Sequence, residues 1–590
     1  MKTLTCKYVF VFLAVFIVSA CAQARSLDYN TLMSGTYLST VKLSAYTPDA
    51  GATAATNTFE GTLTLTFPGT LSSTTVFTNS NYAPDVATAK TWPADFAYQF
   101  VQNGGDIIPV RRGAIPSSHG WWEVILEPGK VWNESADNGY TRAAIPFSLQ
   151  QKNANCTHNG VLMFLFKSDG SVSKTAMQIT GETCLYLKLD LWGLLTTTYT
   201  PQTVSNKAAL ISAYNAEVAN RMPVGTMSQL AAAYPSLTVG NFAIGAAASR
   251  TLYGVVVNGV NYVSSCTTRN GDYPYCDVMD LPSFSTAKSA FASLALMRLQ
   301  LLYGNTSSQL IKNNVPECSQ VAWSTNNGTW SAPTFANTLN MATGNYDSPT
   351  YEVDEGASKT NGLFVPTDHS SKITYSCGAY SRYYNTVTKK YTTPGSVWVY
   401  HTSDTYILGT AMNNYLKTQT GRVTDDIYTN VILADIFNPL HLSPTNAVTR
   451  RTYDSVAQPF TGWGLTYHHD DVAKLGKFLA VDNAIINGVQ VLDNTMYTTA
   501  MQRNSADRGL QTGAYTNFKY KYGFWARNLK TELSCTNATW VPFMSGFGGI
   551  SVVLFPNGVV YYNFAEDGLS ATFDWKNPAI EVKKISNYCQ

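Results

Sequence analysis

Charged side chains are scarce in this chain of 590 residues. Asp, Glu, Lys and Arg make up only 13% of it, and 40 basic against 38 acidic residues leave a formal net charge of +2. There is no basic run or stripe of the kind that binds nucleic acid. There is also no glycine-rich loop followed by Lys and Ser or Thr, which a phosphate-binding loop would contain. We therefore expect no nucleic-acid partner and no bound nucleotide.

Long apolar runs are missing as well, once the first two dozen residues are set aside. The best later candidate, residues 185–195, is short and contains Lys188 and Asp190. A membrane-spanning helix needs about 20 consecutive apolar residues, so no membrane span is expected. The chain is nevertheless 45% hydrophobic, which is enough to build the cores of two domains.

The N-terminus has the pattern of an export signal. Two lysines precede an apolar stretch at residues 8–18, and Ala22-Gln23-Ala24 resembles a signal-peptidase site. We predict that residues 1–24 are a signal peptide and that the protein is secreted. An alternative is that Cys21 carries a lipid, as in a bacterial lipoprotein, which would make the protein periplasmic or lipid-anchored.

Cysteines are few but even in number once the signal is removed. Eight remain, no two are spaced as Cys-x-x-Cys, and metal or redox sites are therefore not indicated. An even count in an exported chain predicts disulfides, although eight cysteines allow 105 pairings. Pairing neighbours in order predicts Cys156–Cys184, Cys266–Cys276, Cys318–Cys377 and Cys535–Cys589.

Five Asn-x-Ser/Thr triplets are present, which favours a glycoprotein of a eukaryotic secretory pathway. Such triplets also arise by chance in a chain rich in Asn and Thr. The candidate glycosylation sites are Asn133, Asn155, Asn305, Asn327 and Asn537.

The chain divides into two parts by its patterning. Short β-type runs bounded by Gly, Pro and Asn fill residues 25–195, which predicts an all-β domain of the sandwich type. Residues 196–206, rich in Thr with one Pro, are predicted to be a linker. In residues 207–590, strands precede and follow a block of helices, which predicts an α+β domain whose first and last strands share one sheet.

A Ser-x-x-Lys tetrapeptide opens the predicted helix that runs through residue 299. Residues three apart share a helix face, so the hydroxyl of Ser285 and the amine of Lys288 are expected side by side. A desolvated lysine can take the proton of a serine and activate it as a nucleophile. A second copy, Ser171 to Lys174, lies in a predicted hairpin, where nothing holds the lysine against the serine.

Three further segments place Ser285 in a wider pattern. A stretch containing Tyr400 leads into an apolar helix, Gly462-Trp463-Gly464-Leu465 precedes another helix, and Ser545-Gly546-Phe547-Gly548-Gly549 precedes a strand. In this order and spacing, residues 225–580 resemble the serine β-lactamase and penicillin-binding-protein superfamily. The resemblance is to the branch of class C β-lactamases, related esterases and nylon-oligomer hydrolases. It implies a β-lactamase/transpeptidase-like domain, an antiparallel sheet flanked by helices.

The resemblance also implies roles for individual residues. Ser285 would be the acylated nucleophile, Lys288 would help to remove its proton, and Tyr400 would pass a proton to the leaving group. The backbone amides of Ser285 and Phe547 would form the oxyanion hole. The implied substrate-binding positions are Thr402, Met544, Ser545 and Gly546. The chemistry requires no cofactor.

The third motif departs from the family. Where β-lactamases have Lys-Thr-Gly, this chain has Met544-Ser545-Gly546, and Met544 cannot pair with a carboxylate as a cation does. We therefore expect an ester or amide substrate, either a small molecule or the end of a polymer, without an essential carboxylate. A catalytically silent binding or adhesion protein is one alternative. A β-lactamase or D-Ala carboxypeptidase, with Arg527 or Lys530 supplying the cation, is another.

Two features leave questions open. The sequence His468-His469-Asp470-Asp471 contains metal-ligand residue types, but adjacent helix residues point in different directions and Asp at a helix start is ordinarily a cap, so no metal is expected. The all-β domain would position substrate, cover the cleft or mediate assembly. The sequence does not choose among these roles and does not indicate an oligomeric state.

Overall fold

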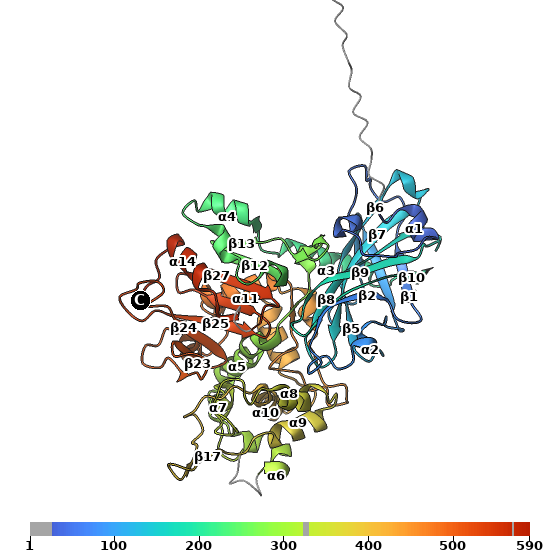
Figure 1. Ribbon diagram of the computed structural model, residues 1–590. Coiled ribbons are helices and arrows are strands. Elements are labelled where there is room, and N and C mark those ends of the chain that lie inside the picture. Colours follow the sequence, from blue (N-terminus) through green and yellow to red (C-terminus); the bar gives the residue numbers. More distant parts are fainter. Residues whose placement is uncertain (1–25, 323–329, 569–571) are drawn as a thin grey trace, which may run out of the picture.

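The computed structural model describes residues 26–322, 330–568 and 572–590. The predicted signal peptide 1–24, the alternative lipid site at Cys21 and the candidate glycosylation site Asn327 lie outside these described residues. Two bodies lie side by side in Figure 1, a β-rich N-terminal body in blue and cyan and a larger body of strands and helices in green to red.

The N-terminal body is built on one antiparallel sheet of ten strands. Its order is β1-β3-β4-β6-β7-β8-β9-β10-β2, β5 pairs with β7, and β1 also pairs with β10, so the sheet closes on itself. The predicted two-sheet sandwich is therefore wrong: pairing of β1 on both sides joins the sheet into one and removes the open edge that a sandwich would leave. The strands are β1 (Glu60–Thr66), β2 (Ser72–Thr78), β3 (Ala97–Asn103), β4 (Asp106–Pro109), β5 (Trp122–Leu126), β6 (Gly129–Asn133), β7 (Thr141–Gln151), β8 (Thr157–Phe166), β9 (Thr175–Thr183) and β10 (Leu187–Pro201), with short helices α1 (Tyr29–Met33) and α2 (Val86–Ala89).

Strands β7, β8 and β9 are buried on both faces. Side chains alternate between the faces of a strand, and along β7 Ile145 and Phe147 face the interior of the closed sheet whereas Ala144 belongs to a core shared with the larger body. Along β8, Met163 and Leu165 belong to that shared core. The larger body, together with the N-terminal segment that contains α1, covers the outer face of these strands, and this explains why their sequences are nearly continuous apolar runs.

The predicted linker is shorter than expected. Strand β10 pairs with β1 as far as Pro201, so residues 196–201 belong to the sheet. The threonine-rich sequence there is strand-forming because β-branched side chains suit the pleated backbone. Residues 202–206 alone separate β10 from helix α3 (Lys207–Ala219).

The larger body has a nine-stranded sheet of order β11-β13-β12-β27-β26-β25-β24-β23-β22, antiparallel except for the β11–β13 pair. Its early strand β12 pairs with its last strand β27, which confirms the predicted α+β arrangement with a shared sheet. The strands are β11 (Val224–Thr226), β12 (Arg250–Val257), β13 (Val260–Val263), β22 (Leu510–Gln511), β23 (Phe518–Lys521), β24 (Phe524–Asn528), β25 (Trp540–Gly546), β26 (Ile550–Leu554) and β27 (Val560–Ala565). Two-residue strands form four further pairs, β14 (Thr267–Thr268) with β15 (Gly271–Asp272), β16 (Leu281–Pro282) with β19 (Thr466–Tyr467), β17 (Tyr384–Asn385) with β18 (Lys390–Tyr391), and β20 (Ile485–Ile486) with β21 (Val489–Gln490).

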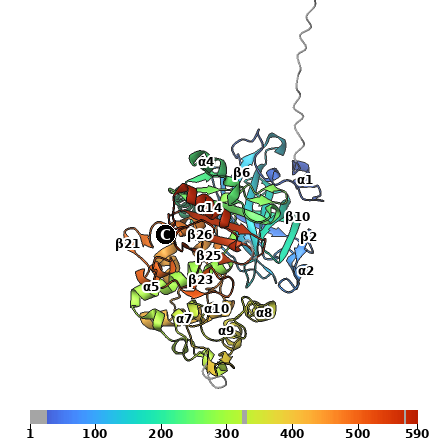
Figure 2. The same cartoon turned by 60° about the vertical axis from the view of Figure 1, so that its left-hand side comes forward.

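Helices flank this sheet and extend beyond it. Helix α11 packs on β12, β26 and β27, and helices α7 to α10 gather below the sheet in Figures 1 and 2. Their bounds are α4 (Met227–Ala233), α5 (Leu294–Tyr303), α6 (Glu317–Ala322), α7 (Phe335–Leu339), α8 (Ala357–Phe364), α9 (His369–Gly378), α10 (Thr402–Thr420), α11 (His469–Ala480), α12 (Asn494–Ala500) and α14 (Lys576–Ile585).

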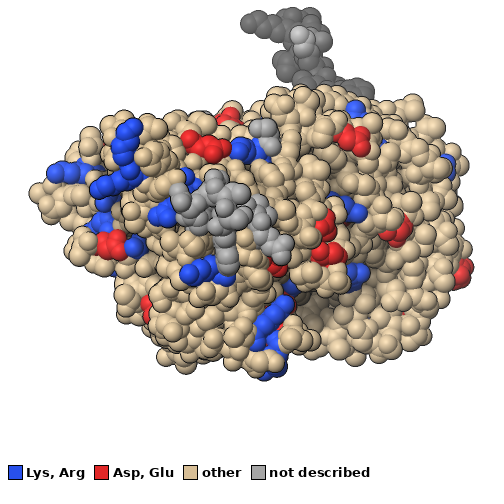
Figure 3. Space-filling model, turned by 90° about the horizontal axis from the view of Figure 1, so that it is seen from below, with Lys and Arg blue, Asp and Glu red and all other residues tan. Residues whose placement is uncertain are grey.

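Four disulfides fasten the fold, and they join the cysteines that were predicted to pair. The pairs are Cys156–Cys184, Cys266–Cys276, Cys318–Cys377 and Cys535–Cys589. Across the described residues, no helix combines the length and the apolar character needed to cross a membrane. The surface seen from below is mostly uncharged, with acidic and basic side chains scattered over it, and it is hollowed near its middle (Figure 3).

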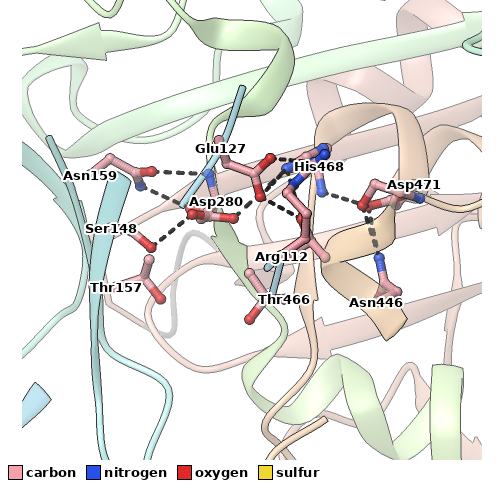
Figure 4. A network of polar contacts seen from close by, with 12 residues as sticks. Arg112, Glu127, Ser148, Thr157, Asn159, Asp280, Asn446, Thr466, His468 and Asp471 are labelled. Carbon is pink, nitrogen blue, oxygen red and sulfur yellow. Dashed lines mark hydrogen bonds and ion pairs between the residues drawn. The ribbon is translucent and has the colours of Figure 1, made fainter. Parts of the chain in front are cut away.

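A buried polar network joins the two bodies (Figure 4). Arg112 of the N-terminal body forms ion pairs with Glu127 and, 3.1 Å away, with Glu217 of α3. The other oxygen of Glu127 lies 3.4 Å from Nε2 of His468, at the start of α11. Asp280 of the larger body accepts a hydrogen bond of 2.8 Å from Ser148 of β7.

The carboxyl of Asp280 is 1% exposed, and its second oxygen has no hydrogen-bond partner. Burial, reinforced by the negative charge of Glu127, raises the pKa of Asp280 to about 8. Asp280 is therefore protonated at neutral pH in the folded protein, although it ionises near pH 4 in the unfolded chain. Folding then retains a proton that the unfolded chain has lost, so this group makes stability fall as the pH rises from about 4 to 8.

We predict that Asp280→Asn raises the melting temperature by a few degrees at pH 8 and leaves it unchanged near pH 4, because an amide keeps the shape of the protonated carboxyl without its titration. Thermal unfolding followed by circular dichroism across pH 4–9 measures this difference. Asp272→Asn, at an exposed position, is the matched control and should show no such trend. A destabilised Asp280→Asn variant at pH 8 would contradict the protonated carboxyl.

Candidate active site

Ser285 lies at the start of a compound helix rather than of the single regular helix that was predicted. A 3-10 turn, Phe284–Thr286, leads into the π-helical segment Lys288–Ser293 and then into α5. Phe284 has φ of +39°, an unusual conformation for a residue with a side chain. The chain therefore turns sharply before Ser285, which is partly exposed, while Lys288 is 1% exposed. The second tetrapeptide differs, since Ser171 and Lys174 lie exposed before β9.

The amine of Lys288 faces the hydroxyl of Ser285. Its Nζ lies 2.9 Å from Oγ of Ser285, 3.0 Å from Oγ1 of Thr402 and 3.4 Å from the carbonyl oxygen of Gly462. Burial lowers the pKa of Lys288 to about 8, against the opposing effect of the negative charge of Glu355. A large share of Lys288 is therefore neutral under mildly alkaline conditions, and a neutral amine can accept the proton of Ser285.

Tyr400 is the third group at this point. Its ring centroid lies 4.8 Å from Nζ of Lys288. Burial raises the pKa of its phenol well above the usual value, the charges of Tyr520 and Glu355 add to this, and a hydrogen bond with Ser285 opposes it. The phenol therefore keeps its proton at neutral pH and can donate it. The alcohol, amine and phenol expected from the sequence thus converge in space.

Strand β25 ends beside the nucleophile. A Cβ atom at Gly546 would lie 3.0 Å from the carbonyl oxygen of Ser283 and 2.9 Å from Cβ of Ile550, so the close approach requires glycine here. This approach brings Phe547 to the nucleophile segment, where its ring centroid is 5.8 Å from that of Phe284.

The residues of the third motif differ in exposure. Ser545 is partly exposed, as a substrate-contacting residue must be, whereas Met544 is 2% exposed and belongs to the shared core. Successive strand residues face opposite sides. The expected contact of Met544 with substrate is therefore corrected to a packing role.

Glu355 was not identified from the sequence. Its carboxylate accepts hydrogen bonds from the backbone N–H of Thr402 and, at 2.9 Å, from the hydroxyl of Thr402. An anion is stabilised at this position because Thr402 begins α10, whose free N–H groups carry a partial positive charge. No motif marks Glu355, and the one signal was that Thr402 stands shortly before a predicted apolar helix.

Asn155 comes from the N-terminal body and holds the nucleophile segment. Its Oδ1 accepts hydrogen bonds from the N–H of Phe284 at 2.9 Å, the hydroxyl of Ser283 at 3.0 Å and the N–H of Gly464 at 2.8 Å. Its Nδ2 donates to the carbonyl of Leu465 at 3.3 Å. Asn155 is 1% exposed, so its prediction as a glycosylation site is wrong. A triplet in the sequence carries no information on burial.

Metal-ligand side chains occur together at one place in the described part of the chain. Ligand atoms of Glu127, Asp280 and His468 all lie within 4.8 Å of one another (Figure 4). However, the negative charge of Glu127 raises the pKa of His468 to about 9 against the effect of burial, so at neutral pH the ring is an imidazolium whose Nε2–H faces Glu127 at 3.4 Å and Asp280 at 3.8 Å. A metal ion bound to Nε2 would have to displace this proton. In addition, Arg112 already neutralises the charge of Glu127. These contacts favour a polar junction over a metal site.

No family model and no curated protein matches the chain. Similar solved structures include a putative 6-aminohexanoate-dimer hydrolase from Bacillus anthracis, 17% identical with a TM-score of 0.40 over 57% of this chain and 78% of that one. EstCE1, a hydrolase with promiscuous acyltransferase activity, is 13% identical with a TM-score of 0.41 over 64% and 99%. A class C β-lactamase is 13% identical with a TM-score of 0.36 over 57% and 90%. The likeness is one of fold, and the function proposed below rests on the geometry of the site.

Proposed function

We propose that this protein is a secreted serine hydrolase that acts through an acyl-enzyme on an ester or amide. One observation carries the proposal: the Nζ atom of buried Lys288 lies 2.9 Å from Oγ of partly exposed Ser285, and burial lowers the lysine pKa to about 8. A nucleophile within hydrogen-bond reach of a base that is neutral near working pH is the arrangement that acyl transfer requires.

The first half of the reaction transfers the acyl group to the enzyme. Neutral Lys288 accepts the proton of Ser285 as Oγ forms a bond to the substrate carbonyl carbon. The backbone N–H groups of Ser285 and Phe547 stabilise the resulting oxyanion. When the bond from carbon to the leaving oxygen or nitrogen breaks, Tyr400 gives its proton to that atom and regains one from the Lys288 ammonium. A water molecule then attacks the acyl-enzyme through the same proton path in reverse, releasing the acid and free Ser285.

The charges around the site support a substrate without an essential carboxylate. Met544 is buried and apolar, and the guanidinium of Arg527 is bound to Glu532 at 3.0 Å and to the carbonyl of Phe573 at 2.6 Å. Neither therefore offers a free cation to a substrate anion. Lys530, the other candidate cation, is exposed in the turn between β24 and β25. The packed Met544 and the engaged Arg527 favour hydrolysis of a neutral small molecule or polymer end over the β-lactamase and D-Ala carboxypeptidase alternatives.

A catalytically silent binding protein is the competing function, and the packed Met544 is the observation that favours it. The lowered pKa of Lys288 weighs against it. Burying an amine beside a partly exposed hydroxyl costs stability, and a binding protein without turnover gives no reason for that cost. The two functions differ in turnover.

Ser285→Ala is expected to abolish labelling by a fluorophosphonate probe and to lower kcat/KM for short-chain nitrophenyl esters about a thousandfold or more, because the acyl-accepting oxygen is gone. Ser171→Ala, in the second Ser-x-x-Lys sequence, is the matched control and should behave as wild type. Nitrocefin tests the β-lactamase alternative. Labelling and turnover that survive in Ser285→Ala would refute the mechanism, and labelling of wild type without turnover would favour the silent binding protein.

The pH dependence of acylation provides a second test. Lys288 must be neutral to act as the base, so kcat/KM for a neutral ester should rise with pH and level off above about 8. The Glu355 carboxylate stabilises the Lys288 cation, so Glu355→Gln should shift this limb to lower pH. Glu352→Gln, which removes a neighbouring carboxylate, is the control and should leave the limb in place. A Glu355→Gln limb that moves to higher pH would contradict the assignment of the base.

Asn155→Ala is expected to lower kcat about ten- to a hundredfold with little change in KM, because the segment before Ser285 loses the acceptor that fixes it. Asn155→Asp keeps one oxygen acceptor and should restore part of the rate. Fluorophosphonate labelling rates report the same effect independently of leaving-group chemistry. Circular dichroism distinguishes positioning from unfolding, and a folded Asn155→Ala variant with full kcat would contradict the positioning role.

A further inference from the structure

Four aromatic rings from both bodies meet beside the nucleophile. Phe547 lies between the bodies, with ring centroids 5.8 Å from Phe284, 6.1 Å from Tyr82 and 6.3 Å from Tyr186. Tyr82 and Tyr186 of the N-terminal body are 5.8 Å apart. We name these residues, Tyr82, Tyr186, Phe284 and Phe547, the aromatic wall. Phe547 and Phe284 pack against the core of the N-terminal body, although both belong to the larger body.

The aromatic wall is accessible on one side and supported on the other. Tyr82, Phe284 and Phe547 are partly exposed, while Tyr186 is 6% exposed and packs behind them. Ser285 directly follows Phe284 and is also partly exposed. The exposed ring surface therefore begins at the residue next to the nucleophile. Fixed rings of this kind bind flat apolar groups by offset stacking or edge contacts, at little entropic cost.

We propose that the aromatic wall is the acyl-binding site of the hydrolase and that it selects esters or amides whose acyl group is flat and apolar. This inference rests on the proposed function. In that mechanism the leaving group lies toward Tyr400, which protonates it, so the acyl chain takes the other side of the carbonyl carbon. Phe547 supplies both an oxyanion-hole N–H and a ring of the wall. The N-terminal β body is thereby part of the catalytic site, because Tyr82 is the exposed ring that it contributes.

The test compares nitrophenyl acetate with nitrophenyl benzoate, which share a leaving group. Tyr82→Ala should lower the ratio of kcat/KM for the benzoate to kcat/KM for the acetate about tenfold, because only the larger acyl group reaches the ring. Tyr82→Phe keeps the ring and should retain the preference. Tyr140→Ala is the control, a partly buried tyrosine of the same body whose ring contacts Tyr29.

A benzoate-to-acetate ratio that is unchanged in Tyr82→Ala, with active wild type, would overturn the acyl-binding site alone. Wild type that neither hydrolyses any ester nor reacts with fluorophosphonate would instead overturn the proposed function.

Discussion

The side-chain oxygen of Asn155 accepts hydrogen bonds from both halves of the catalytic framework. One donor is the N–H of Phe284, next to the nucleophile, and another is the N–H of Gly464, two residues from the carbonyl that contacts Lys288. Asn155 is buried, so in the docked protein these donors have its side-chain oxygen as their acceptor and would be left unsatisfied without it. The positions of the nucleophile and its base therefore depend on docking of the N-terminal body.

This dependence explains the unusual burial of the N-terminal sheet. The outer face of β7, β8 and β9 packs on the shared core, and Asn155 stands in the turn between β7 and β8, next to the Cys156–Cys184 disulfide. The polar junction adds a buried charged contact between the bodies, in which Nε2 of His468 lies 3.4 Å from Glu127. Such contacts favour one docking geometry because a shifted alternative would leave charges unpaired. The N-terminal body thus forms one side of the site. The same docking places its Tyr82 and Tyr186 beside Phe547.

Local patterns in the sequence predicted the parts of the site that lie close together along the chain. The three-residue spacing placed Ser285 beside Lys288, and the order of motifs added Tyr400 and the end of β25. The placement of strands before and after the block of helices predicted the sheet shared by β12 and β27. Asn155 and Glu355 were missed because their roles depend on tertiary contacts, with Phe284 and Thr402, that no local pattern encodes. The closed sheet was missed because alternation specifies which face of β1 is buried but not its partner on each side.

Glu355 and burial act on Lys288 in opposite directions, and the balance sets the chemistry. Burial alone would keep the amine neutral but would leave no means of recovering a proton for the leaving group. The carboxylate of Glu355 offsets part of this effect. Glu355 is held at the start of α10 by the N–H and the hydroxyl of Thr402, and the same hydroxyl contacts Nζ of Lys288. A base whose pKa lies near the working pH exchanges protons in both directions, as the acylation and deacylation steps each require. The helix start that orients Thr402 therefore also tunes the base, and one local structure performs both tasks.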